Sequence, residues 1–221
     1  VVVWDSYGST GGDSSSFSIQ ARRFAADGSP LGGQFQINFH TTLAQEHPSV
    51  ASDSDGNFVV VWDSNSSTGT DTDGRSVHGQ RFGANGATLG PQFQVNLVTS
   101  GTQASAAVAR HSQGSFVIVW ESASSFGTDT TGYSIQAQRY STAGTPLGDP
   151  FQVNSYTAGD QLAPDVAIDG LGNFVIAWAS YGSGGDDTSG DSIQARRFAP
   201  DGTPLAEDFQ VNSYTTGVQG Q

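Results

Sequence analysis

The stretch Phe-Val-Val-Val-Trp at residues 58–62 decides the fold, because close copies of it recur along the chain. Related runs stand at residues 1–4, 116–120 and 174–178. The spacing between copies is 58 residues each time, with tryptophans at Trp4, Trp62, Trp120 and Trp178. A constant period without insertions indicates a structural repeat. We therefore expect one repeat domain, 1–221, with units at residues 1–58, 59–116, 117–174 and 175–221.

Each period contains four strand-like runs, which we call strands A to D. In the copy around residue 58, strand A is expected at residues 48–51 and strand B at 58–62, which is apolar on both faces, as in a strand packed between neighbouring sheets. In the first copy, strand C is expected at 19–24 and strand D at 35–38. Four antiparallel strands per repeat are typical of a β-propeller blade. The sequence predicts an all-β propeller, either open or part of a larger ring.

The count of residues predicts one incomplete blade. Four full periods would take 4 × 58 = 232 residues, and the chain has 221. The 11 missing residues (232 − 221) correspond to strand A and its turn, so the last unit is expected to lack strand A. We expect a neighbouring part of a longer precursor, or further blades of a larger ring, to complete the array.

Composition excludes several functions. The formal net charge is −13, and all 8 basic residues are Arg. Phosphate binding needs a basic surface, so we expect no nucleic-acid partner and no attraction to anionic membranes. There is no Cys, which rules out disulfides and thiolate chemistry. There is also no run of 18 apolar residues, so no membrane insertion is predicted.

The long connections are where a binding site is expected. The A–B and C–D turns are short and contain Gly, which supplies the positive φ of tight hairpins, whereas the B–C and D–A connections are long and share the opposite face. The B–C loops repeat Gly-x-Asp, and acidic loops of this kind are candidates to bind Ca²⁺. The alternative is an Asx turn, in which Asp caps its own loop. The candidate metal ligands are Asp13, Asp71, Asp73, Asp129 and Asp187.

The D–A loops repeat a glutamine beside aromatic residues. Such pairs bind sugars by stacking and hydrogen bonding, although they also pack loops in propellers of any function. The candidate ligand-binding residues are Gln45, Gln103, Tyr156, Gln161, Tyr214 and Gln219. A second repeated series, Arg23, Arg81, Arg139 and Arg197, is expected to pair with a carboxylate or carbonyl between blades.

No catalytic constellation is visible in the sequence. His40, His47, His78 and His111 share no register and no metal-ligand spacing. There is no Gly-x-Ser-x-Gly elbow and no Gly-rich phosphate loop. The sequence therefore predicts that the chain is not an enzyme.

The order Phe-Val-Val-Val-Trp, acidic Gly/Ser loop, Ser-Ile-Gln-Ala-Arg-Arg-Phe, Gly-x-Pro-Leu-Gly and Phe-Gln-Val-Asn resembles tandem repeats of large bacterial secreted and cell-surface proteins. The resemblance covers the whole chain and implies an extracellular or cell-surface location. With the acidic charge, it favours a non-enzymatic module for adhesion, scaffolding or assembly. Its partner would be a protein or a glycan, or the module would assemble with other copies or segments of its own chain. The alternative is a lectin-like propeller that binds carbohydrate through its B–C and D–A loops.

Overall fold

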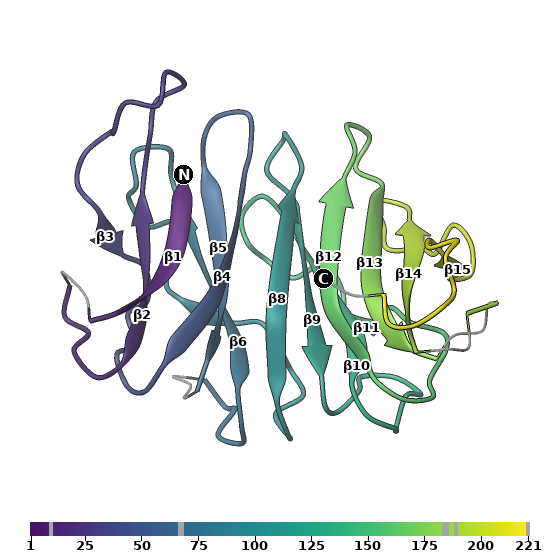
Figure 1. The fold of residues 1–221 in the computed structure, drawn as a ribbon. Coiled ribbons are helices and arrows are strands. Elements are labelled where there is room, and N and C mark those ends of the chain that lie inside the picture. Colours follow the sequence, from purple (N-terminus) through teal and green to yellow (C-terminus); the bar gives the residue numbers. More distant parts are fainter. Residues whose placement is uncertain (9–10, 66–68, 183–185, 188–189, 220–221) are drawn as a thin grey trace.

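A computed structural model describes residues 1–8, 11–65, 69–182, 186–187 and 190–219. Among these residues no helix is long and apolar enough to cross a membrane. They form fifteen strands in four antiparallel sheets (Figure 1). The sheets are β1 (Val2–Tyr7), β2 (Phe17–Arg22) and β3 (Phe35–Gln36); β4 (Gln45–Ser52), β5 (Phe58–Ser64), β6 (Ser76–Phe82) and β7 (Phe93–Gln94); β8 (Gln103–Arg110), β9 (Phe116–Ser122), β10 (Ser134–Tyr140) and β11 (Phe151–Gln152); and β12 (Gln161–Ile168), β13 (Phe174–Tyr181), β14 (Asp191–Phe198) and β15 (Phe209–Gln210).

The four sheets stack face to face as propeller blades do. One edge strand of each sheet lies beside that of the next, in the order β1, β4, β8, β12 (Figure 1). Apolar side chains fill the three spaces between consecutive sheets, and Trp62, Trp120 and Trp178 each belong to one of these cores. The predicted all-β propeller of antiparallel blades is confirmed, with three four-stranded sheets and a three-stranded first sheet.

The sheets are offset from the sequence periods. A period counted from Val1 begins with strand B, whereas each complete sheet begins with strand A, at Gln45, Gln103 or Gln161. A sheet therefore spans the boundary between two periods. The sheet without strand A is the first one in the chain, although the unit that is short by count is the last.

Tight turns occupy one end of every sheet, as predicted. Asp53 N donates to Asn57 O at 2.9 Å in an A–B turn, and Ala25 N donates to Ser29 O at 2.8 Å in a C–D turn. Gly56 and Gly28 in these turns have φ of 81° and 83°. The B–C and D–A connections leave from the other ends of the strands, and we call the surface that they form the long-loop face.

Strand A contains a feature that the sequence did not reveal. His47, Ser105 and Ala163 have φ of 54°, 53° and 50°, which are unusual values for residues other than glycine. Each lies where the pairing of strand A with strand B shifts register, between residues 46 and 49 in the second sheet and at the equivalent places in the next two. Such a β-bulge changes the direction in which the side chains near the end of the sheet point. All three bulges lie next to the long-loop face.

The array is open in the part of the chain that the structure describes. The first and fourth sheets stand at opposite ends of the row (Figure 1), and no pair of their strands makes extensive contact. Every residue of β5 is buried, whereas in β13 Val175 and Tyr181 are exposed. The end sheets thus bury one face each, while the two middle sheets bury both.

Candidate functional site

A three-residue polar network repeats beneath the long-loop face of every sheet. In the first copy Asn38 Nδ2 lies 3.0 Å from Asp13 Oδ2 and 2.9 Å from Gln45 Oε1. Asn38 Oδ1 accepts the Ile19 amide at 2.9 Å, which ties the network to strand C. The same contacts join Asp71, Asn96 and Gln103; Asp129, Asn154 and Gln161; and Asp187, Asn212 and Gln219.

The aspartates predicted as metal ligands belong to this network. Asp13, Asp71, Asp129 and Asp187 are buried, and the first three accept the amide of the residue two positions on, as in the Asx turn that was the alternative. Burial raises the pKa of the Asp71 and Asp129 carboxyl groups. Asp73 accepts the Gly101 amide at 3.0 Å. No group of three or more His, Asp or Glu among the described residues is arranged to hold a metal ion, and nothing positively indicates a cofactor.

The glutamines predicted as ligand-binding residues have partners within the protein. Gln45 and Gln103 are buried, and their Nε2 atoms donate to Thr42 O and Ser100 O, both at 3.0 Å. Gln161 is buried too, and its Nε2 donates to two loop carbonyls. Ligand binding by these amides stays a prediction, and it would require breaking contacts that shape the D–A loops.

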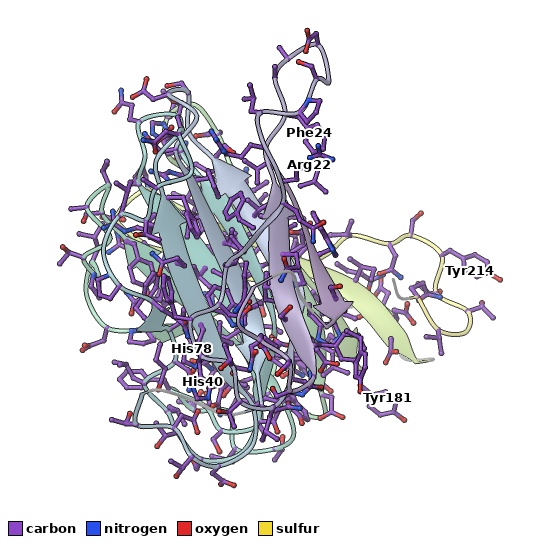
Figure 2. The ribbon with its side chains drawn as sticks, turned by 90° about the vertical axis from the view of Figure 1, so that its left-hand side faces the viewer. Arg22, Phe24, His40, His78, Tyr181 and Tyr214 are labelled. Carbon is purple, nitrogen blue, oxygen red and sulfur yellow. The ribbon has the colours of Figure 1, made fainter. Side chains whose placement is uncertain are left out.

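The predicted aromatic residues lie on the last two D–A loops. Tyr156 is half-buried and packs against Gly182 of the next sheet. Tyr214 is exposed and projects from the last sheet, as does Tyr181 (Figure 2). On other loops of the same face Phe39 is also exposed. The long-loop face therefore carries aromatic side chains in contact with solvent.

The repeated arginines bind carbonyl oxygens between blades, as predicted. Arg81 Nη1 donates to Thr142 O at 3.0 Å, and Arg139 Nη1 donates to Pro200 O at 2.8 Å. Arg23 makes the same contact with Ala84 O. The series links strand C of one sheet to the C–D turn of the next.

One cluster of charged residues breaks the repeat. Glu46 and His47 stand at the bulge of β4, Asp63 lies near the end of β5, and Arg75 precedes β6. The next sheet carries Ala104, Ser105, Glu121 and Tyr133 at these positions, and the fourth sheet carries Leu162, Ala163, Ala179 and Asp191. A concentration of charge in only one of several near-identical units is a signal of a local role.

The geometry of this cluster centres on a buried carboxylate. The Asp63 side chain is 1% exposed, and its Oδ2 lies 2.9 Å from His47 Nδ1 and 3.6 Å from Arg75 Nη1. The Ser105 amide of the next sheet donates to the same oxygen at 3.2 Å. Arg75 Nη2 lies 2.7 Å from Glu46 Oε2. Asp63 Oδ1 is buried without a hydrogen-bond partner among the described residues.

His47 is the outward-facing member of the cluster. Its side chain is 63% exposed, and the hydrogen bond from Nδ1 to Asp63 raises the pKa of the imidazole. A carboxylate on Nδ1 fixes the ring and leaves Nε2 free to exchange a proton. Sequence reasoning missed this site because it required the histidines to share a register, whereas the departure from the register is what distinguishes His47.

Comparison with known proteins adds little beyond architecture. No protein-family model matches the chain, and no curated protein matches it. The solved structures that are similar to it include two GH43 proteins. A GH43 endo-arabinanase from Bacillus licheniformis has a TM-score of 0.48 and 15% identity, covering 97% of this chain and 79% of that one. A mutant of the GH43 protein BlXynB from the same organism has a TM-score of 0.43 and 12% identity, covering 90% of this chain and 40% of that one.

These findings correct two predictions. One is that the chain is a non-enzymatic module for adhesion, scaffolding or assembly, and the other is that it is not an enzyme. Both are contradicted by the comparison, in which the similar solved structures are GH43 proteins. At these identities the likeness concerns the fold, and the activities of those two proteins do not pass to this chain.

Proposed function

We propose that this chain is a carbohydrate-active β-propeller in which His47, held by Asp63, exchanges protons with a saccharide bound on the long-loop face. The observation that carries the proposal is the Glu46–His47–Asp63–Arg75 cluster. It concentrates charged side chains at one bulge, in one sheet, beside the face that bears the longest loops.

The cluster has the parts that proton transfer needs. Asp63 is a positioning residue, because it is buried and its Oδ2 is already bound by three groups. It holds the Nδ1 side of His47, so Nε2 is the atom that faces a ligand. An imidazole with a raised pKa keeps its proton to higher pH and serves as a general acid near neutrality.

The chemistry of the face favours a neutral saccharide. Glu46 and Arg75 offer hydroxyl-binding groups of both signs next to His47, and exposed aromatic rings such as those of Phe39 and Tyr7 present flat apolar surfaces with polar surroundings. The net charge of −13 disfavours polyanionic glycans.

The direct test is glycan hydrolysis by the purified chain. Release of reducing ends from a panel of neutral polysaccharides is measured for the wild type and for His47→Ser. Serine is the residue that the next sheet carries at this bulge, as Ser105, so the substitution should leave the fold intact. We expect kcat to fall about 100-fold or more, the usual contribution of a general acid or base.

Two further variants separate catalysis from folding. His111→Ser changes a histidine of the tight-turn end, next to the turn at Gly114, and should leave activity unchanged. Asp63→Asn should shift the pH profile of kcat to lower pH, because it removes the carboxylate that raises the pKa of His47. If no polysaccharide is cleaved, or if His47→Ser is as active as the wild type, the proposal fails.

An extracellular or cell-surface setting goes with this proposal. Its support is the acidic, Cys-free composition and the resemblance of the repeat to those of large bacterial secreted proteins. Detection of the chain in culture medium or on intact cells with a specific antibody tests it.

A further inference from the structure

The three interfaces between consecutive sheets are copies of one another. We call the side of a sheet that meets the next sheet its forward face, and the side that meets the previous sheet its rear face. At the last interface, Val117, Ile135 and Val153 of the forward face pack against Ile176 and Phe198 of the rear face. The first two interfaces use the residues 58 and 116 positions earlier, except that Val1, the equivalent of Val117, is exposed.

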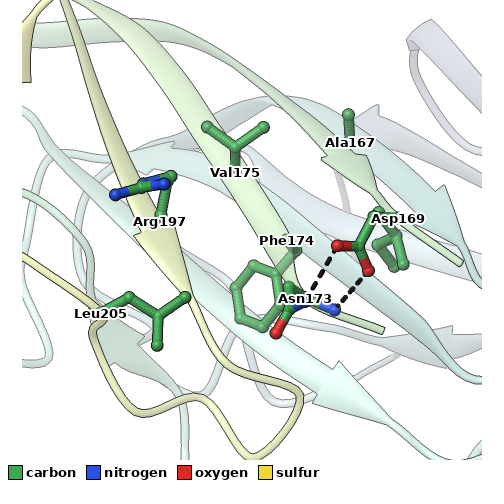
Figure 3. A pocket seen from close by; sticks show the side chains of 8 residues that line it. Ala167, Asp169, Asn173, Phe174, Val175, Arg197 and Leu205 are labelled. Atoms are coloured by element: carbon green, nitrogen blue, oxygen red, sulfur yellow. Dashed lines mark hydrogen bonds between the residues drawn. The ribbon is translucent and has the colours of Figure 1, made fainter. Parts of the chain in front are cut away.

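The forward face of the fourth sheet is an uncovered copy of this surface. Val175 is 36% exposed, whereas its equivalent Val59 is fully buried. Val211 is 55% exposed, whereas its equivalent Val95 is 2% exposed. A cavity of about 350 Å³ lies at this face, lined by Val175, Leu205 and Arg197 among others (Figure 3).

The rear face of the first sheet is the uncovered counterpart. Val2 is 53% exposed and Phe24 is exposed as well, whereas their equivalents in the fourth sheet, Ile176 and Phe198, are buried. Figure 2 views the molecule from the side of the first sheet and shows Phe24 beside Arg22 near one end of that sheet. The two ends of the array therefore present, apart from the strand A that the first sheet lacks, the two halves of an interface that the chain forms three times internally.

A polar contact fixes the register of each internal interface and is available at the ends too. The strand C arginine donates to a carbonyl 61 residues on, in the C–D turn of the next sheet. The arginine side chain lies directly against a glycine of that turn. A Cβ atom at Gly144 would be only 2.4 Å from Arg81 Nε, and one at Gly202 only 2.8 Å from Arg139 Nε, so the glycine leaves room for the arginine.

The end positions are matched in the same way. Arg197 borders the cavity of the fourth sheet, and no hydrogen bond from its guanidinium group is found within the described residues. The equivalent turn of the first sheet has open space at Gly28. The carbonyl in register with Arg197 is that of Ala26, because Ala84, Thr142 and Pro200 follow it in steps of 58.

We propose that the forward face of the fourth sheet binds the rear face of the first sheet of a second copy of this chain. The apolar faces pack as they do inside each copy, and Arg197 donates to Ala26 O of the second copy. The occupant is argued to be another copy because both surfaces repeat this chain's own interfaces in strands B to D, the strands that the first sheet contains. Such a head-to-tail contact is heterologous, so it either closes a ring or continues as an open chain.

The test is the mass of the particle in solution as a function of concentration, by sedimentation equilibrium. Salt near 0.15 M or above is required, because copies with a net charge of −13 repel one another at low ionic strength. We expect the wild type to associate between about 1 µM and about 1 mM, and association to strengthen with salt. Val175→Asp and Phe24→Asp should each be monomeric, while Leu97→Asp, on the exposed long-loop face, should associate like the wild type.

Mixing the two monomeric variants gives the sharpest result. Val175→Asp keeps an intact rear face and Phe24→Asp keeps an intact forward face, so together they should form a 1:1 pair that cannot grow. Arg197→Ala should weaken the association of the wild type about tenfold, as expected for loss of a charged hydrogen bond. A wild type that stays monomeric throughout, or a mixture that forms no pair, overturns the proposal. Association that both aspartate variants leave unchanged also overturns it.

Discussion

Strands β5 and β13 have related sequences and different surroundings. Both begin Phe-Val and carry Trp as the fifth residue. All seven residues of β5 are buried, because a sheet covers each side of it. In β13 only alternate residues are buried, because one face is open to solvent. The repeat therefore determines which side chains are apolar, whereas the neighbouring sheet determines which of them are buried.

The same contrast holds for polar residues. Equivalent positions in the four sheets usually make the same hydrogen bonds, as the Asp–Asn–Gln network shows. Where one sheet differs, as at His47 and His78, the difference creates a local property that the other sheets lack. Substitutions at equivalent positions can therefore separate the effect of a residue from the effect of its place in the array.

The largest effect is expected from the same charged substitution at two equivalent valines. Val59→Asp places a carboxylate in the core between the second and third sheets and should lower the free energy of unfolding by at least about 4 kcal/mol. Val175→Asp places it on the open face and should cost less than about 1 kcal/mol. Urea denaturation of both variants, at a concentration where the chain is monomeric, measures the difference. Equal losses would mean that Val175 is buried in the monomer.

A second contrast concerns acid stability. His78 is buried at a position where the other sheets carry Gln20, Gln136 and Gln194. Burial lowers the pKa of His78 from 6.5 to about 4. Between these values the unfolded chain binds a proton that the folded chain does not, so the free energy of unfolding falls as the pH drops from 6.5 to 4.

The variant His78→Gln should remove this acid sensitivity. Gln136 Nε2 donates to Ser134 Oγ at 2.8 Å, and a glutamine at residue 78 can make the same bond to Ser76. At pH 4 the contribution of His78 amounts to about 3 kcal/mol. Thermal melts of both proteins at pH 7 and pH 4 test the prediction. If the variant loses as much stability on acidification as the wild type, His78 is not the cause.

A smaller effect is expected from the arginines. Arg81→Ala removes a hydrogen bond to Thr142 O between sheets and should cost about 1 kcal/mol. Arg197→Ala should leave the stability of the monomer unchanged, because its partner would come from a second copy. Denaturation midpoints of the two variants, compared at low protein concentration, give the answer. A substantial loss in Arg197→Ala would reveal a contact within the chain.

The smallest effect is expected from calcium. Asp13, Asp71, Asp129 and Asp187 already accept an Asn amide hydrogen within the protein. We expect calcium or EDTA to move the melting temperature by less than about 1 °C, because a ligand shifts stability only where it binds the folded state. A rise in the melting temperature of about 5 °C or more at saturating calcium would instead show that these loops bind the metal.

The sequence was sufficient to predict the architecture, because the 58-residue repeat specifies the strands, the turns and the apolar core positions of each blade. The spacing of Trp62 and its equivalents, the Gly turns and the apolar strand B together specify blades, and the carbonyl partners of Arg81 and Arg139 were anticipated. The Asp–Asn–Gln network was not, because its members lie 7 and 25 residues apart and only folding brings them together.

The candidate site lay beyond sequence reasoning for a related reason. The bulge at His47 depends on a positive φ in a residue other than glycine, and no local sequence pattern predicts such a conformation. The hydrogen bond from the Ser105 amide to Asp63 joins two sheets, and the two residues are 42 positions apart in the sequence. A comparison of the repeats position by position, with attention to where charge is gained, would have identified Glu46, His47 and Arg75.

The most direct test of the open array is hydroxyl-radical footprinting read by mass spectrometry, at a concentration where the chain is monomeric. Val175 and Val211 should be oxidised readily, while their equivalents Val59 and Val95 should be protected. Equal protection at all four positions in the monomer would show that the first and fourth sheets cover each other, and would contradict the account.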